Sequence, residues 1–344
     1  MKKFFSLIAL FSCVAVSYAQ SSMLATLNHE GTVSTFYGAT ALRDAHNAAV
    51  HGDVITLSSG SFVSTDITKA ITLRGAGMEI DTLSGTEPTV ISGDFNIQIA
   101  DTVSRRLTIE GIYHNHNLKY KGTLTNALFL KNRLYNVDLA NNGIMKNASF
   151  IHCRIADNFR LNENSSASCI NCAIEDPTSQ NSTTSNFEFQ NCVIKFNSIY
   201  TGYVYSSTFK NCLIYNISGN LGSTANQISS SCMAYNCVGF NQNTSNPLFK
   251  NIPNSTNVHV GDITTVFKTY TGQSLQKLDS ENFELTDEAK SKYLGTDGTQ
   301  VGIYGGSLPF TSTPSNPQIT KCNVAAKSTA DGKLSVDIEV KAAE

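Results

Sequence analysis

A short phrase, apolar–x–Asn–Cys–x–apolar, recurs about every twenty residues through the middle of this 344-residue chain. Counted along the sequence, its cysteines step by 19, 20, 20 and 25 residues, at Cys153, Cys172, Cys192, Cys212 and Cys237. The runs between them show no helical hydrophobic period. A fixed period of this length predicts that each repeat is one turn of a solenoid of short parallel strands, stacked on the next.

The Asn-Cys pairs predict two structural columns. Asn tolerates the left-handed backbone that a sharp bend between strands needs, so we expect the bends to stack as a ladder whose amides bond from turn to turn. Its expected members are Asn132, Asn171, Asn191, Asn211 and Asn236, with His152 standing in once. The cysteines should form a parallel column of buried, reduced, small apolar fillers. Only Cys169 and Cys172 have C-x-x-C spacing, so we predict no metal site.

Similar turns can be followed towards the N-terminus, each a β-rich run that ends at a Gly or Asn. They are 54–57, 71–75, 89–93, 107–111 and 128–132. Together with the later copies they predict about ten turns of some twenty residues each.

The two ends of the repeat carry a family resemblance. Residues 39–50, then 52–62 and 71–77, and at the far end 246–249, 282–285 and 295–306, resemble secreted right-handed parallel β-helix proteins of the pectin-lyase-like class. The Arg-Pro pair common in the closing part of that class is missing. The resemblance spans residues 33 to 310 and implies a short helix near 39–50 that plugs the open end. It says little about activity, because this fold carries lyases, hydrolases, esterases, adhesins and inert scaffolds.

We therefore predict an all-β chain: a right-handed parallel β-helix over residues 20–310, then a linker and a small C-terminal β-hairpin tail over 311–344. Residues 1–19 have the basic start, apolar run and small-residue end of a cleaved signal peptide, which predicts a secreted or cell-surface protein. A lipoprotein modified at Cys13 is the alternative. Without Lys2 and Lys3, 23 basic residues face 27 acidic ones, which argues against nucleic acid as a partner. No later segment is predicted to span a membrane.

Candidate chemistry gathers in residues 105–138. Lyases that act on uronic acids need a base and a group that neutralises the substrate carboxylate. The candidates for catalysis are Lys119, Lys121, Arg133, His114 and His116, and those for binding are Arg105, Arg106, Tyr120 and Asp138. A second hypothesis places Asp138, Asp157 and Asp176 one above another, as paired carboxylates of a glycoside hydrolase. No cofactor is expected, although Asp297 could hold calcium.

The leading functional hypothesis is a non-catalytic, monomeric scaffold that contacts a polysaccharide or another envelope glycan along its long flat face. The first alternative is a polysaccharide lyase or glycoside hydrolase acting on an acidic glycan at residues 105–138. The second is an adhesin or assembly module that uses the tail or an exposed edge.

Overall fold

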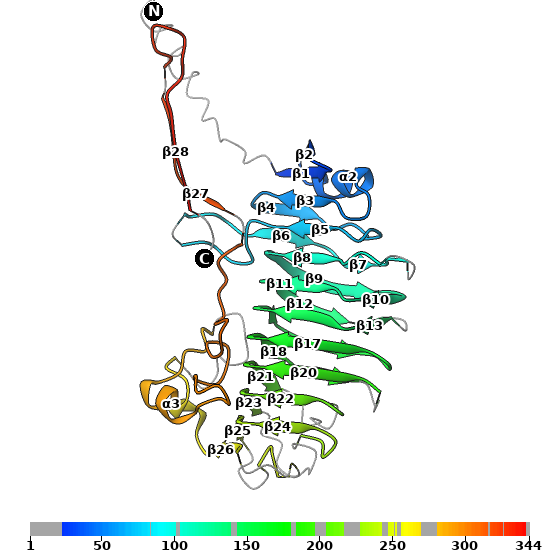
Figure 1. Cartoon of the computed structure of the whole chain (residues 1–344), viewed down its shortest axis with the longest axis vertical. Coiled ribbons are helices and arrows are strands. Elements are labelled where there is room, and N and C mark those ends of the chain that lie inside the picture. The colour runs from blue at the N-terminus through cyan, green and yellow to red at the C-terminus, as the bar shows by residue number, and fades with distance from the viewer. Residues whose placement is uncertain are drawn as a thin grey trace, which may run out of the picture.

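The computed structural model describes residues 23–82, 84–100, 104–138, 143–179, 184–196, 204–216, 228–242, 247–250, 252, 256–269, 281–315, 317–325 and 327–341. The predicted signal peptide and Cys13 lie outside these residues. The chain winds into a right-handed parallel β-solenoid of about 8 turns, shown upright in Figure 1. Ten turns were expected from the sequence. The difference arises in part because Thr89–Ser92, counted as a turn of its own, belongs to a second sheet within the same coil.

Sheet A has eleven strands along the solenoid axis. Nine are parallel, and an antiparallel pair, β2 and β1, extends the N-terminal edge. In order they are β2 (Thr32–Tyr37), β1 (Leu24–His29), β3 (Val54–Leu57), β5 (Thr72–Arg74), β8 (Thr108–Glu110), β11 (Leu128–Leu130), β14 (Ala148–Ile151), β17 (Ser166–Ile170), β20 (Asn186–Gln190), β22 (Thr208–Lys210) and β24 (Met233–Tyr235).

Sheet B is entirely parallel along its main path and bends at a corner. Its main path is β4 (Gly60–Val63), β6 (Thr89–Ser92), β9 (Ile112–Tyr120), β12 (Arg133–Asp138), β15 (Arg154–Ile155), β18 (Ala173–Glu175), β21 (Val193–Phe196), β23 (Leu213–Asn216), β25 (Val238–Asn241) and β26 (Val258–Val260). Beyond the corner, the C-terminal parts of β9 and β12 pair with β7 (Phe95–Ile97) and β16 (Phe159–Leu161), and β16 pairs with β19 (Pro177–Ser179). A third side holds β10 (Thr123–Thr125) and β13 (Ile144–Lys146).

Inward-facing side chains of all sides form one continuous core. Alternate residues of each strand point inward, so apolar residues of successive turns stack directly. Phe129 and Phe150 lie 4.5 Å apart between ring centroids, and Phe189 and Phe209 lie 5.0 Å apart. Helix α2 (Ala41–Ala48) covers the N-terminal end of this core with its buried Ala41, Leu42 and Ala45.

A second apolar cluster lies outside the coil, on the lower part of sheet B. After β26 the chain forms η3 (Ile263–Thr265) and α3 (Asp287–Lys292) and then runs back towards the N-terminal end, on the left in Figure 1. We call residues 281–310 the closing segment. Its apolar side chains cover the outward-facing Ala173, Val193 and Leu213, so β18, β21 and β23 are buried on both faces.

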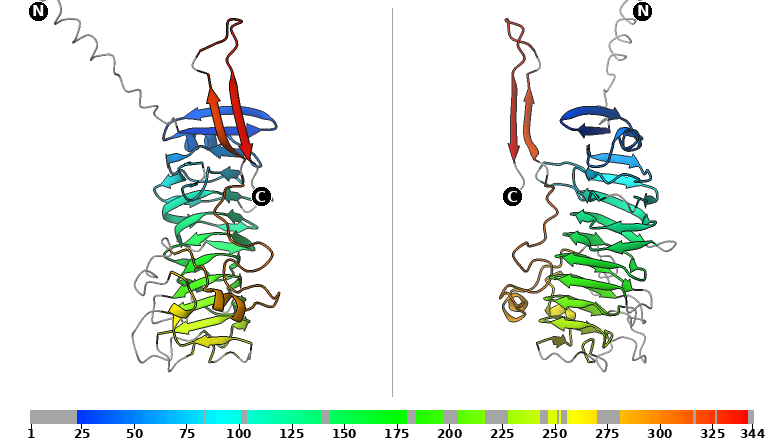
Figure 2. Two further views of the ribbon diagram at one scale, coloured as in Figure 1. Left: turned by 90° about the vertical axis from the view of Figure 1, so that its left-hand side faces the viewer. Right: turned by 45° about the vertical axis from the view of Figure 1, so that its right-hand side comes forward.

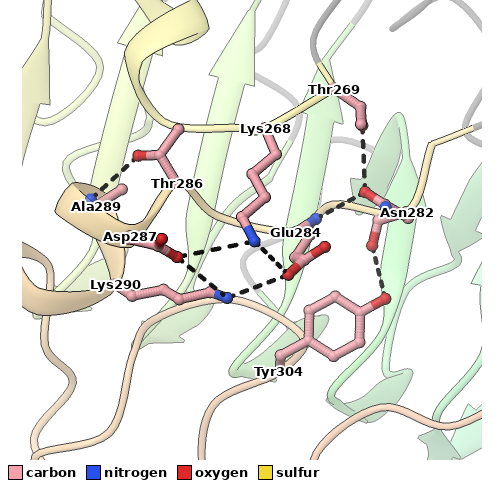
Figure 3. A network of polar contacts seen from close by, with 9 residues as sticks. All are labelled: Lys268, Thr269, Asn282, Glu284, Thr286, Asp287, Ala289, Lys290 and Tyr304. Atoms are coloured by element: carbon pink, nitrogen blue, oxygen red, sulfur yellow. Dashed lines mark hydrogen bonds and ion pairs between the residues drawn. The ribbon is translucent and has the colours of Figure 1, made fainter.

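Polar contacts hold α3 in place (Figure 3). The Glu284 carboxylate accepts from Lys268 Nζ at 2.8 Å and from Lys290 Nζ at 3.2 Å, and the Tyr304 hydroxyl donates to the Asn282 carbonyl at 2.7 Å. The Thr286 hydroxyl caps the helix by accepting from Ala289 N–H. The ion pairs are exposed to solvent, so each contributes little to stability.

The chain ends in an antiparallel hairpin of β27 (Gln318–Val324) and β28 (Val336–Lys341), which projects past the N-terminal end of the solenoid in both views of Figure 2. Every described residue of β28 is exposed. No helix among the described residues is long and apolar enough to cross a membrane.

Candidate functional site

The bend column differs from the expected ladder at one member. Strand β11 pairs with β14 so that Leu130 faces Ile151, which places Lys131 opposite His152 and Asn132 opposite Cys153. Lys131 has the left-handed backbone, as do His152, Asn171, Asn191, Asn211 and Asn236. Asn132 therefore belongs to the cysteine column, and its expected place in the asparagine ladder was wrong by one residue.

The bend asparagines bind the closing segment rather than one another in their described contacts. Asn171 Nδ2 donates to the carbonyls of Ile303 (2.7 Å) and Gly305 (2.8 Å). The Asn211 side-chain oxygen accepts from Thr296 N–H at 2.9 Å, Asn236 Nδ2 donates to the Leu294 carbonyl at 3.2 Å, and His152 Nε2 bonds the Leu308 carbonyl at 3.0 Å. This column is thus a docking strip for the returning chain.

The cysteine column is buried, and its thiols form hydrogen bonds in addition to filling space. Cys172 Sγ accepts from Cys153 N–H and donates to the Phe150 carbonyl of the turn above, both at 3.3 Å. Asn132 fills this role at the upper end, where its side-chain oxygen accepts from Ile112 N–H and its Nδ2 donates to the Ile109 carbonyl. Asn257 does the same at the lower end, with Cys237 N–H and the Ala234 carbonyl. Cysteine and asparagine are equivalent here because both satisfy backbone groups that the bend leaves unpaired.

The thiols of this interior are shielded from solvent. Burial raises the pKa of Cys153, Cys192 and Cys237 well above the ordinary value, and raises that of Cys232 to about 11. For Cys172 and Cys212, burial is outweighed by hydrogen bonds from the adjacent cysteines, which lower the pKa. The seven cysteines of the solenoid, including Cys169, are unpaired and buried. Because these thiols are buried and bond backbone groups, the geometry gives the column a structural role.

The equivalence of thiol and amide predicts how the column responds to substitution. Cys172→Asn should keep both turn-to-turn bonds, whereas Cys172→Val leaves the Cys153 N–H unpaired. We expect the free energy of unfolding of Cys172→Val to be about 1–3 kcal/mol lower than that of Cys172→Asn, because a buried polar group left without a partner costs about this much. Urea unfolding followed by far-ultraviolet circular dichroism measures the difference. If Cys172 only filled apolar space, the Val variant would be more stable than the Asn variant. That result would contradict the hydrogen-bonding role of the thiol.

The three aspartates proposed as stacked carboxylates do not stack. Val137 pairs with Phe159, which brings Asp138 opposite Arg160 on the next turn; on the turn before, Asp138 pairs with Lys119. Asp176 precedes Pro177, the partner of Phe159, and so lies opposite Asn158. The carboxylate column of a glycoside hydrolase is therefore not formed, and this expectation was wrong.

Several of the candidate site residues from 105–138 make structural contacts within the protein. His114 is fully buried, its Nε2 bonds the Gly93 carbonyl at 2.9 Å, and burial lowers its pKa. Tyr120 is also fully buried, and burial raises its pKa. Arg133 lies over the Tyr113 ring at 4.4 Å. His116, Lys121, Arg105 and Arg106 are exposed.

Arg105 stands apart from the others, at the wall of a cavity of about 270 Å³. Its lining includes the buried apolar residues Ile99, Leu107 and Leu124 and the polar residues Ser104, Thr123, Thr125 and Asn126. No other candidate from residues 105–138 lines this cavity. The predicted patch is thus divided between the interior, this cavity and one outer face.

That outer face, formed by β7, β16, β19 and the C-terminal parts of β9 and β12, carries a hydrogen-bonded polar arrangement. Asn136 Nδ2 donates to the Asn117 side-chain oxygen at 2.9 Å, and Asn117 Nδ2 donates to Asp94 at 3.2 Å. Lys119 Nζ binds the other Asp94 oxygen at 2.6 Å, and this contact lowers the pKa of Asp94. An amide–amide bond of the kind expected between bends is found here, between Asn136 and Asn117. We call this surface the polar face.

A β-bulge forms the corner that leads onto the polar face. Between paired Leu134–His114 and Asn136–Asn117, β9 has two residues where β12 has only Tyr135. All three, Asn115, His116 and Tyr135, are exposed. Bulges of this kind redirect side chains and are common beside binding sites. Tyr135, Asn117, Asn136 and Arg160 were missed from the sequence because only strand register brings them to the candidate surface.

Metal ligation receives no support from this geometry. The Asp297 carboxylate accepts from the backbone N–H and the hydroxyl of Thr299, at 3.0 and 2.8 Å, as in a tight turn. Within the described parts of the chain, no group of three or more His, Cys, Asp or Glu side chains could hold a metal ion.

The fold and the polar face define a parallel β-solenoid with an ordered polar surface. Comparisons of the chain with protein-family models, with curated proteins and with solved structures gave no match.

Proposed function

We propose that this protein is a secreted or cell-surface β-solenoid that binds a glycan along its polar face without cleaving it. The observation that carries the proposal is the polar face itself, where partly exposed Asn, Asp, Lys and Arg side chains recur on successive turns. Hydrogen bonds fix several of them before any ligand arrives. Such preorganisation lowers the entropy lost when a polar ligand binds, and Tyr135 at the corner offers a ring on which a sugar can pack.

Binding without cleavage fits the state of the candidate catalytic groups better than lyase chemistry does. The best placed base, His114, faces the interior, and Lys119 is held by Asp94. The strand register does not stack Asp138, Asp157 and Asp176 in one column, as the hydrolase hypothesis required. A lyase remains a measurable alternative, because β-elimination from a uronic acid creates an unsaturated product that absorbs in the ultraviolet.

A glycan array and pull-down on insoluble polysaccharides test the proposal. The mature protein should bind at least one glycan, and a triple variant, Lys119→Ala with Asp138→Ala and Arg160→Ala, should bind it at least about tenfold more weakly, or about 1.4 kcal/mol. The matched control changes exposed residues of sheet A, Glu188→Ala with Lys210→Ala, and should bind normally. A blank array, equal loss in the control, or unsaturated product released from the bound glycan contradicts the proposal.

A further inference from the structure

Charge alternates from turn to turn along one column of the polar face. Lys119 on β9 pairs with Asp138 on β12, and Asp138 lies opposite Arg160 on β16. Before Lys119 the column has Asn96, and after Arg160 it has Thr178. The two cations are therefore two turns apart, with one carboxylate between them. All three charged side chains are partly exposed.

The spacing of this column suits a polymer better than a single sugar. Neighbouring strands lie about 4.8 Å apart, which is close to the length of one pyranose unit along an extended polysaccharide. A chain lying parallel to the solenoid axis would thus place about one sugar on each turn. Lys119 and Arg160, about 9.6 Å apart by this spacing, would then contact alternate sugars, and Asp138 the sugar between them.

We propose that the ligand is an unbranched polysaccharide that lies along the solenoid axis and carries a carboxylate on every second sugar. This inference rests on the proposed function and adds the ligand class. Lys119 and Arg160 pair with carboxylates two sugars apart, and Asp138 repels a carboxylate on the intervening sugar. Asp138 is then the residue that determines specificity, since discrimination between ligands often depends on a repulsive element as well as on attractive ones.

The surroundings of the column are compatible with this pairing. Asp94 accepts from Lys119, whose side chain is 29% exposed, so a ligand carboxylate can approach the ammonium from solvent while Asp94 orients it. Asp66 lies at the upper end, where it accepts from Asn96 at 2.8 Å. The carboxylates Asp66, Asp94 and Asp138 outnumber the cations Lys119 and Arg160 by one, which disfavours a densely charged polyanion. The arrangement favours a ligand whose carboxylates recur on every second sugar. The attraction between these carboxylates and the two cations, Lys119 and Arg160, should weaken as the salt concentration rises.

The decisive experiment compares three soluble probes by isothermal titration calorimetry at low salt. Hyaluronan carries a carboxylate on every second sugar, polygalacturonate on every sugar, and dextran on none. The unaltered protein should prefer hyaluronan to polygalacturonate by at least about tenfold, or about 1.4 kcal/mol. Asp138→Asn should tighten polygalacturonate binding about three- to tenfold and change hyaluronan binding less than twofold. Glu188→Gln on sheet A is the matched control and should leave both affinities unchanged.

The outcomes separate this inference from the proposed function. Equal or stronger binding of polygalacturonate or dextran by the unaltered protein overturns the charge repeat, while glycan binding itself stands. The same holds if Asp138→Asn leaves the preference unchanged. Failure to bind any of the three, together with a blank glycan array, overturns both. Hyaluronan oligosaccharides add a length test: affinity should rise until the chain spans from Lys119 to Arg160 and then level off.

Discussion

Lys195→Met should lower the free energy of unfolding by about 3–5 kcal/mol at pH 8, because it leaves a buried carboxylate without its cation. Lys195 on β21 is fully buried, and its Nζ lies 3.0 Å from Glu175 Oε1 on β18, which is 5% exposed. Both side chains lie on the outer side of sheet B, in line with Ala173 and Val193. Replacing both partners, Glu175→Leu with Lys195→Met, should restore stability to within about 1 kcal/mol, since apolar pairs replace buried ion pairs at little cost.

The destabilisation caused by Lys195→Met should also depend on pH. Burial raises the pKa of Glu175 to about 7, and the attraction of Lys195 opposes that rise. Without Lys195 the folded-state pKa should be higher still. A carboxyl whose pKa is raised on folding stabilises the protein below its unfolded value, and this stability is lost as the pH rises through the folded pKa. Lys195→Met should therefore cost more at pH 8 than at pH 5, by up to about 1.4 kcal/mol, because the original and raised pKa values of Glu175 give different protonation only above about pH 7.

Urea unfolding at both pH values tests the pair. Circular dichroism is the suitable probe because the chain contains no Trp. The double variant is the control, and it should lose the pH-dependent difference because it has no ionisable group at either position. If Lys195→Met is equally destabilising at pH 5 and pH 8, the loss comes from packing and the ion pair does not matter to stability.

The repeat made the coil predictable, but it did not make the register predictable. The interior column of thiols followed from the period because each Cys sits at the same place in its turn. Counting in steps of about twenty nevertheless misplaced Asn132, since Lys131 to His152 is 21 residues and His152 to Asn171 is 19. A one-residue error exchanges a bend position for an interior one.

The polar face was hidden from sequence reasoning for the same physical reason. The bulge at Asn115–His116 changes the register between β9 and β12. A second change follows on the next turn, where one extra residue lies between Ile155 and Phe159, so Asp138 faces Arg160, 22 residues later, instead of Asp157. The partners of the bend asparagines were also out of reach. Asn171 binds Ile303, 132 residues away, and no local pattern encodes so distant a contact.

Asn171→Ala should lower the free energy of unfolding by about 3–4 kcal/mol, the second largest effect we expect. The buried amide serves two carbonyls of the closing segment, and its loss leaves both without this donor, at about 1–3 kcal/mol. The backbone adds a further term, because Asn171 has a φ of 49° and Ala in the left-handed region costs about 1–2 kcal/mol.

Two controls separate these contributions. Asn171→Gly relieves the backbone and still removes the amide, so it should retain most of the loss. Asn126→Ala has the same backbone problem, with a φ of 55°, at an exposed bend away from the closing segment, and should cost only the backbone part. If Asn171→Gly is as stable as the unaltered protein, the amide does not hold the closing segment.

Loss of the Asn171 amide should also open one part of the molecule selectively. The closing segment covers Ala173, Val193 and Leu213, so weakening its attachment lets these apolar side chains reach solvent without unwinding the coil. Hydrogen exchange in Asn171→Gly should speed up in residues 294–310 and stay slow in sheet A strands such as β17 and β20. Uniformly faster exchange would mean that the closing segment and the solenoid unfold as one unit, contrary to a separately docked segment.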